Sequence, residues 1–342
     1  MRLPSPLGLS GLSTWIPEER QTARQAVEQG LVEAETAAEL GYAALPVSGE
    51  AAPEMAVRAA RAALESTGTA PAELGMVLHA WMYYQGHDLW SPPHYIADQL
   101  GARHAEPLGV QQVCNGGAAA VEVGVARLLT DPALRYALVT TADRFAAPGF
   151  DRWRGDYGIA YGDGATALLL HSPQERPAEL LLHAVTTVAA PQLERMHRGR
   201  DPFGLMPRSV SDRVDMRRTK KAFLEREGME AFTKASGESL AVVVERCLAA
   251  AGLASDSPRL RYVVPPRLGA KTIDLAYAPA LRRMLTAEIL TLGGDTGHLG
   301  AGDAAASLAE LHAERRLAPG EFALVVSAGA GFTWSCLLVS AA

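Results

Sequence analysis

The stretch LGVQQVCNGGAAAVEVGVARLLTD, residues 108–131, determines the fold that we expect for this chain. It joins the strand-like LGVQQV to a run of small and apolar residues that favours a helix. Cys114 lies at the junction, and the helix would begin at or beside it. The sulfur would then lie in the positive field of a helix N-terminus, where thiols become reactive. Cys114 is therefore a candidate functional residue.

The other two cysteines have the surroundings of core residues. Cys247 lies in the apolar helical run SLAVVVERCLAAAGL, and Cys336 lies in the strand-like FTWSCLLVS. A thiol in such a run is usually a small buried hydrophobe. Three scattered cysteines are too few for a disulfide framework or a thiolate metal site, so we expect neither.

The two halves of the chain repeat one pattern. AVRAARAALESTG (56–68) leads into LGMVLHA (74–80), and LAVVVERCLAAAG (240–252) leads into LRYVVPP (260–266), in each case helix, glycine stop, loop and strand. The shift of 184 positions that aligns these segments also places Cys114 on His298. GDGATALLL (162–170) and GAGFTWSCLLV (329–339) form a further pair of glycine turns entering buried strands. Three correspondences between the halves, in the same order along the chain, indicate an internal duplication.

Duplicated halves in which strands alternate with helices predict an α/β protein whose two similar sheets pack around shared helices. A pseudo-two-fold axis would bring the two equivalent helix N-termini to one central site, with Cys114 beside His298. The proline-rich and charged HSPQERPAE (171–179) marks the boundary. We therefore expect an N-terminal half at 1–172 carrying the cysteine and a C-terminal half at 173–342 carrying the histidine.

Composition excludes several classes of protein. The 342 residues include 32 basic and 38 acidic side chains, and the formal charge of -6 gives no electrostatic basis for binding nucleic acid. Hydrophobic residues make up 48%, which is ordinary for a globular protein. Neither a long apolar run nor a secretory leader pattern is present. We expect a cytoplasmic protein with no membrane partner.

Four segments, taken together and in order, resemble the ketoacyl synthase III group of the thiolase superfamily: LGLSGLSTWIPE (7–18), VCNGGAAAVEVG (113–124), YGDGATALLL (161–170) and SAGAGFTWSCLL (327–338). The resemblance covers essentially the whole chain. It implies the thiolase fold, a duplicated five-layered αβαβα architecture. It also implies a soluble enzyme that acts on acyl thioesters.

The resemblance assigns Cys114 as the nucleophile that accepts an acyl group from a carrier-protein or coenzyme A thioester. No other cofactor is implied. The oxyanion hole would consist of backbone N–H groups, one from Cys114 and one from the turn Gly329, Ala330 and Gly331. Main-chain donors do not depend on the side chain, so alanine in the middle of this turn is compatible with the role.

Two positions depart from the condensing members of the group. Those members carry His and Asn, whose side chains stabilise the enolate formed when a malonyl thioester loses carbon dioxide. This chain has Pro266 at the histidine position, in VVPPRLG, and His298 at the asparagine position, in GGDTGHLGAGD. Proline offers neither a side-chain donor nor a backbone N–H. The donor pair for decarboxylative condensation is therefore missing.

Cys114, His298 and Asp303 have instead the composition of a catalytic triad. An imidazole oriented by a carboxylate can both favour the thiolate and deprotonate an acceptor. This pattern resembles a branch of the group, found in antibiotic biosynthesis, that transfers acyl groups to hydroxyls of sugars or cyclitols. The resemblance to that branch extends to MYYQGHDLW (82–90), TTADRF (140–145) and GHLGAGD (297–303). We expect an acyltransferase acting through a covalent cysteine intermediate.

Simpler interpretations remain open. His298 could be a loop histidine satisfied by backbone groups, and Asp303 could be a helix cap. A carbon-carbon condensing ketoacyl synthase is the alternative enzyme, and a non-catalytic carrier-binding protein is the third possibility.

Two stretches are candidates for contacts with substrates or partners. The aromatic WMYYQGHDLW (81–90) contributes candidate pocket residues, which would border the acyl pocket or a homodimer interface, or belong to the core. The second stretch is LERMHRGRDPFGLMPRSVSDRVDMRRTKK (193–221), which holds nine basic and four acidic residues, a local charge of +5. Such a charge would attract an acidic carrier protein or a polyketide synthase carrier domain, although a solvated loop is equally compatible with it. The pocket candidates are Tyr83, Tyr84, His87, Trp90 and Phe203.

Overall fold

Strands and helices alternate along most of the chain, and the computed structural model describes all 342 residues. The strands are β1 (Arg2–Trp15), β2 (Arg20–Thr22), β3 (Ala44–Pro46), β4 (Leu74–Ala80), β5 (Glu106–Val110), β6 (Tyr136–Asp143), β7 (Gly164–His171), β8 (Leu180–Ala189), β9 (Leu260–Val264), β10 (Glu288–Ile289), β11 (Phe322–Gly329) and β12 (Thr333–Ala341). The helices are α1 (Ala23–Glu28), α2 (Ala34–Leu40), α3 (Ala52–Thr67), α4 (Pro92–Leu100), α5 (Gly116–Thr130), α6 (Arg195–Arg198), α7 (Met216–Ala251), α8 (Ala270–Thr272), α9 (Ala278–Met284) and α10 (Asp303–Ala313). Single turns lie at Pro71–Glu73, Pro191–Leu193, Ile273–Tyr277 and Gly300–Gly302.

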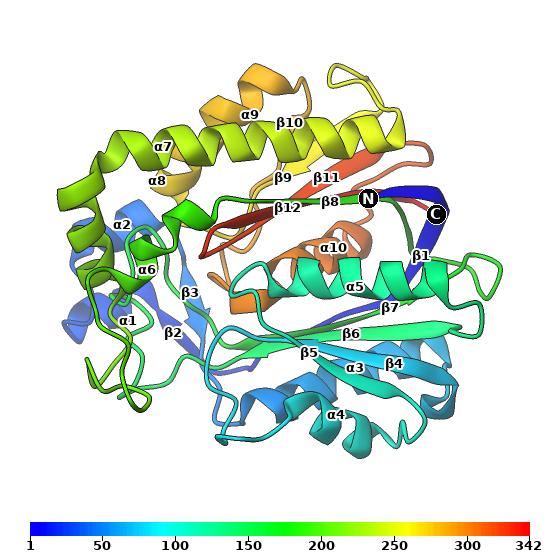
Figure 1. Cartoon of the computed structure of the whole chain (residues 1–342), viewed down its shortest axis with the longest axis horizontal. Coiled ribbons are helices and arrows are strands. Elements are labelled where there is room, and N and C mark those ends of the chain that lie inside the picture. The colour runs from blue at the N-terminus through cyan, green and yellow to red at the C-terminus, as the bar shows by residue number, and fades with distance from the viewer.

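Helices and sheet alternate in five layers, as Figure 1 shows. Helices α7 and α9 cover one outer face, α5 and α10 lie between the two halves of the sheet, and α3 and α4 cover the other outer face. Three clusters of buried apolar side chains fill the spaces between the layers. The expected α/β fold of thiolase type is confirmed.

The strand order reflects a duplicated chain. Ten strands are hydrogen-bonded in the order β10-β9-β11-β12-β8-β1-β7-β6-β4-β5. Read outward from the centre, β1-β7-β6-β4-β5 repeats as β8-β12-β11-β9-β10 with the same parallel and antiparallel pairings. Strand β7 ends at His171 and β8 begins at Leu180. Residue 172 lies between these two strands, and the division of the chain there stays a prediction.

Strand β1 connects the two halves. Its first part pairs with β8 and its last part with β7, and the register shifts between Ser10 and Ser13. Gly11 lies at this irregularity with φ of 60°. A Cβ there would lie 2.6 Å from the carbonyl oxygen of Ala63 in α3, so only glycine allows this close approach. The two expected sheets are thus joined into one.

The two central helices begin close together. A Cβ on Gly116, at the start of α5, would lie 3.3 Å from the Cβ of Ala301, and one on Gly117 would lie 2.4 Å from its carbonyl oxygen. Residues following Cys114 therefore contact residues following His298. The N-terminal ends of α5 and α10 lie at the same end of the molecule as α1, α2 and α6 (Figure 1).

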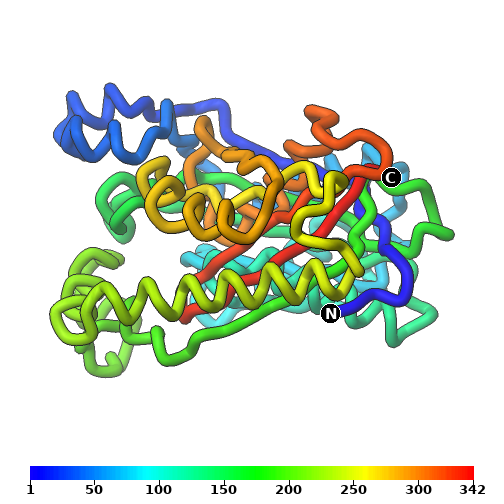
Figure 2. The backbone as a smooth tube through the Cα atoms, turned by 90° about the horizontal axis from the view of Figure 1, so that it is seen from above, coloured from blue at the N-terminus to red at the C-terminus, as the bar shows by residue number.

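Two boundaries differ from the sequence-based expectations. Strand β5 ends at Val110, so Gln111, Gln112 and Val113 form a turn before Cys114. The basic stretch 193–221 is not wholly a loop, because it contains α6 and the first turns of α7. Figure 2 shows the segment 20–46 and the segment leading into α7 projecting at the same end of the molecule. None of the helices combines the length and apolar character needed to cross a bilayer.

Candidate active site

Cys114 lies on a tight turn one residue before the cap of α5. Val113 has φ of 50°, a left-handed conformation that is strained for a β-branched residue. Asn115 caps the helix, and its side-chain amide donates to Ser335 Oγ (2.9 Å) and to Gln112 Oε1 (2.6 Å). Cys114 is partly exposed. The turn therefore presents an accessible sulfur at a helix N-terminus, as the sequence predicts.

His298 is oriented by Asp303. Its Nδ1 lies 2.6 Å from Asp303 Oδ2, and both side chains are almost fully buried. Asp303 Oδ1 accepts the N–H of Leu299 (2.8 Å), and Oδ2 also accepts the N–H of Arg267 (3.0 Å). The N-cap of α10 is Gly302, and the hydrogen bonds of the Asp303 carboxylate go to His298, Leu299 and Arg267, all of which lie outside this helix. The interpretation of Asp303 as a simple helix cap is therefore wrong.

Nε2 of His298 is left free by this arrangement. It is buried and has no hydrogen-bond partner, so backbone groups do not satisfy this histidine. Burial lowers the pKa of His298, but the negative charges of Asp303 and Cys114 outweigh burial and hold the pKa well above its usual range. The close contacts of Gly116 and Gly117 with Ala301 place the start of α5, next to Cys114, against the segment that carries His298 and Asp303.

Cys114 and the 329–331 turn each carry backbone N–H groups without a backbone acceptor. The N–H groups of Cys114, Ala330 and Gly331 donate to no other backbone group. A Cβ on Gly329 would lie 2.6 Å from the backbone nitrogen of Asn115 and 2.8 Å from the carbonyl oxygen of Gln112, so Gly329, at the start of the 329–331 turn, packs against residues on both sides of Cys114. Donors that are free and next to a nucleophile are what an oxyanion hole requires.

Further side chains line the site that the sequence analysis did not single out. Met82 Sδ lies 3.7 Å from Cys114 Sγ. The ring of Tyr161 stands edge-on to His298 with centroids 5.3 Å apart. The buried carboxylate of Asp143 accepts backbone N–H groups from both the Met82 and the Ala301 segments. Asp143 lies in TTADRF, but nothing in its neighbours along the chain reveals these contacts.

The aromatic candidates fall into two groups. Tyr83 packs on Phe145 and Phe150 and accepts a hydrogen bond from Arg208 (2.9 Å). The others extend into solvent: His87 is exposed with its ring against Trp90, and Phe203 is 90% exposed beneath Arg198. Tyr84 is also exposed. A single chain therefore gives no support to Phe203 as a pocket residue.

The remaining thiols and the buried histidine of β4 are structural. Cys247 and Cys336 lie together in the core, and burial raises the pKa of Cys247 to about 12. His79 is bonded to Thr140 (3.0 Å) and Gln85 (3.2 Å), and burial lowers its pKa to about 4. No cluster of three or more His, Cys, Asp or Glu side chains is placed to hold a metal ion.

Comparisons with known proteins agree with this geometry. Two family models, 3-oxoacyl-[acyl-carrier-protein] synthase III and its C-terminal part, match residues 108–187 and 248–341. The curated beta-ketoacyl-[acyl-carrier-protein] synthases III of Serratia proteamaculans and Bartonella henselae are 29% and 26% identical, each over 83% of both chains. A solved structure named ChlB3 and described as an acyltransferase is 31% identical over 98% of both chains, with a TM-score of 0.88. The synthase III of Aquifex aeolicus, 19% identical over 98% of this chain and 99% of that one with a TM-score of 0.76, shares the fold.

The duplicated five-layered fold and the cysteine at its central helix define an acyl-transferring enzyme of thiolase type. More particularly, the chain belongs to the 3-oxoacyl-[acyl-carrier-protein] synthase III family.

Proposed function

We propose that this protein transfers an acyl group from a carrier-protein or coenzyme A thioester to Cys114, and from Cys114 to a hydroxyl of a sugar- or cyclitol-type acceptor. We place the reaction in natural-product, antibiotic-type biosynthesis, on the resemblance noted above. The observation that carries the proposal is the buried His298–Asp303 pair, bonded at 2.6 Å through Nδ1 with Nε2 free. Such a pair is suited to general base catalysis.

In the loading step, Cys114 acts as a thiolate and His298 acts as an imidazolium. The raised pKa of His298 favours its protonated form. The thiolate attacks the thioester carbonyl, and the N–H groups of Cys114 and the 329–331 turn stabilise the oxyanion. The donor thiolate leaves and takes the proton of His298. The products are the acyl-cysteine, a free donor thiol and a neutral imidazole.

The discharge step reverses the proton transfer. Acylation removes the negative charge of Cys114, and this charge is one of the two that raise the pKa of His298. The imidazole is then neutral and accepts the proton of the acceptor hydroxyl as its oxygen attacks the acyl group. Cys114 leaves as a thiolate beside the restored imidazolium. Bonds and protons balance with no cofactor beyond the thioester donor.

A condensing synthase remains the second candidate, because the curated relatives are named beta-ketoacyl synthases. Condensation requires donors that stabilise an enolate. Pro266 supplies none, and the neighbouring N–H, that of Arg267, is already bonded to Asp303. The one remaining side-chain donor would be Nε2 of His298, which can donate to an enolate only when the imidazole is protonated.

The two candidates differ in what they do with a malonyl thioester. We expect malonyl to load onto Cys114 whole, with carbon dioxide release at background level, because the enolate lacks its donor pair. Intact mass and carbon dioxide assays measure both quantities. Steady carbon dioxide release with a β-ketoacyl product would establish condensation and would remove His298 as a base.

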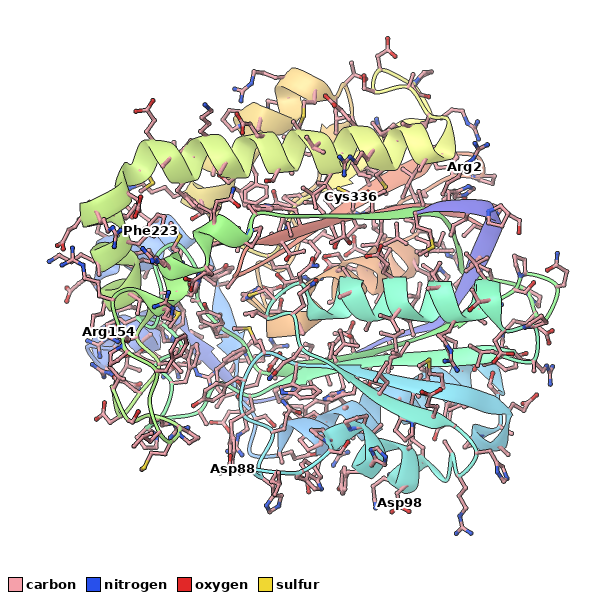
Figure 3. The ribbon with its side chains drawn as sticks, in the orientation of Figure 1. Arg2, Asp88, Asp98, Arg154, Phe223 and Cys336 are labelled. Atoms are coloured by element: carbon pink, nitrogen blue, oxygen red, sulfur yellow. The ribbon has the colours of Figure 1, made fainter.

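A basic pocket lies at the end of the molecule where α5 and α10 begin, and it supports a carrier protein as the acyl donor. Arg154, labelled in Figure 3, lies there. Five basic and two acidic side chains line the pocket, and Arg213 and Lys221 form no ion pair within it. Carrier proteins are acidic, so an unpaired basic rim would steer them. The lining residues are Asp151, Arg154, Gly155, Tyr157, Arg213, Val214, Asp215, Arg217, Arg218 and Lys221.

Reversing charge at this pocket tests the carrier proposal. We expect R213E together with K221E to raise KM for a carrier-bound donor by about tenfold or more, with kcat nearly unchanged. The KM and kcat for a small N-acetylcysteamine thioester, which carries no protein, should be unchanged. The exposed pair R282E and R283E on α9 makes the same change in net charge and should leave KM unchanged. Equal KM values in both double variants would place the carrier elsewhere.

We also propose that the protein is a homodimer in which β5 of one copy pairs with β5 of the other. Strand β5 is an edge of the sheet, and the exposed side chains of Leu108, Tyr84, Leu89 and Trp90 lie on it or in the aromatic stretch. An open edge beside exposed apolar residues is suited to pairing with a second copy. Light scattering measures the mass, and a fully active monomer at nanomolar concentration would exclude this arrangement.

A further inference from the structure

A second buried carboxylate lies beside the triad. Asp143 is the last residue of β6 and is fully buried. Its Oδ1 accepts the N–H groups of Met82 (3.0 Å) and Tyr83 (2.8 Å), and its Oδ2 accepts that of Ala301 (3.0 Å). One side chain therefore ties together two segments that are distant in sequence.

Both of these segments face the reacting groups. Met82 contacts the Cys114 sulfur at 3.7 Å. Ala301 lies in the turn between His298 and Asp303 and packs against the first turn of α5. Gly300 has φ of 61°, and a Cβ there would lie 2.2 Å from Asp143 Oδ2. The carboxylate thus occupies a space that this glycine leaves open for it.

The charge of Asp143 is not neutralised by a lysine or arginine ion pair. Burial raises its pKa to about 7, and the N–H groups of Ala301, Tyr83 and Met82, together with the charge of His298, act in the opposite direction. His298 is the one titratable group among these influences. Coupling between two charges is reciprocal, so an anionic Asp143 must favour the protonated form of His298.

We propose that Asp143 is a positioning residue of this active site, which holds the Met82 and Ala301 segments against Cys114 and, with Asp303, stabilises the imidazolium of His298. The inference rests on the proposed function in treating His298 as the base of the reaction. Its test does not require transfer to any acceptor, so the two can fail separately.

The test is the titration of His298 after Cys114 has been blocked. Carbamidomethylation makes the sulfur neutral, and NMR of 15N-labelled histidine, with His298 assigned from H298A, reports the imidazole. We expect D143N to lower the midpoint of His298 by roughly 1 pH unit, as loss of a nearby opposite charge does. A purely structural role would lower the melting temperature without moving this midpoint.

Asp163 provides a matched control. It is another fully buried carboxylate, which accepts the N–H groups of Ser48 and Phe145 (2.8 Å each) but is paired with Arg152 (3.1 Å). D163N should destabilise the protein and leave the His298 midpoint in place. An unchanged midpoint in D143N, or an equal shift in D163N, would overturn the proposal.

The reciprocal measurement covers the case in which D143N does not fold. Removing the positive charge of His298 should raise the pKa of Asp143 above about 7, because that charge lowers it in the native protein. Carbon-13 labelling of aspartate in H298A and in the native enzyme measures this shift. The same Asp143 midpoint in both proteins would contradict the coupling.

Discussion

Replacing Cys114 with alanine should abolish acyl transfer and covalent labelling by acyl thioesters, with a loss of at least about 10⁴-fold. Cys114 is the accessible thiol of the chain, lies at the start of α5 beside free backbone donors, and acts electrostatically on His298. No other nucleophile occupies this place. Intact mass after incubation with an acyl thioester, together with a transfer assay, measures both losses.

The other two thiols serve as controls. Cys247 and Cys336 are buried in the core cluster beneath α7, and burial raises the pKa of each. C247A and C336A should each cost about 1–2 kcal/mol of stability through lost packing and leave labelling nearly intact. C114S should retain slight activity, because its base remains. Wild-type turnover by C114A would remove the covalent mechanism.

Changing Asp303 to asparagine should depress discharge of the acyl-enzyme by about 10² or more, and loading by less. The Asp303 carboxylate accepts a hydrogen bond from Nδ1 of His298 and so orients the ring. The N–H groups of Leu299 and Arg267 hold the carboxylate itself in place. An amide cannot stabilise the imidazolium that forms as the acceptor loses its proton. Loading suffers less, because a thioester is reactive and the helix N-terminus still favours the thiolate. H298A should harm discharge at least as much.

Single-turnover kinetics separate the two steps. In the native acyl-enzyme, discharge should rise with pH as His298 loses its proton, because only the neutral imidazole accepts one. D295N removes an exposed carboxylate from the same loop and should change neither step. Equal discharge rates for the native enzyme and D303N would reduce the triad to a Cys-His pair.

Local patterns explain why the sequence predicts the fold so fully. Gly68 and Gly252 end α3 and α7 with left-handed caps, and each stop is followed by a strand of the sheet. These signals depend on neighbours along the chain, so they can be read without the structure. The 184-residue shift then relates Cys114 to His298, because equivalent helix N-termini meet at the centre of a duplicated fold.

The rest of the site depends on contacts between distant segments. Asp143 is one carboxylate among 38 acidic side chains, and only the fold reveals that it binds the N–H groups of Met82, Tyr83 and Ala301. The anchoring of Asp303 by the N–H of Arg267 is of the same kind. Phe203 stays a prediction: an aromatic residue in a basic loop resembles a pocket residue in the sequence, and in the single chain its side chain is exposed.

The fate of the acyl-enzyme tests the central claim most directly. Cys114 is first loaded with an acyl thioester, freed of excess donor, and divided between a polyhydroxylated acceptor, a malonyl thioester and buffer alone, with the mass of the protein followed in time. We predict that the hydroxyl acceptor removes the acyl group as an ester well above the rate in buffer, and that malonyl thioester yields no carbon dioxide. Release of carbon dioxide with a β-ketoacyl product, and no ester, would contradict the account.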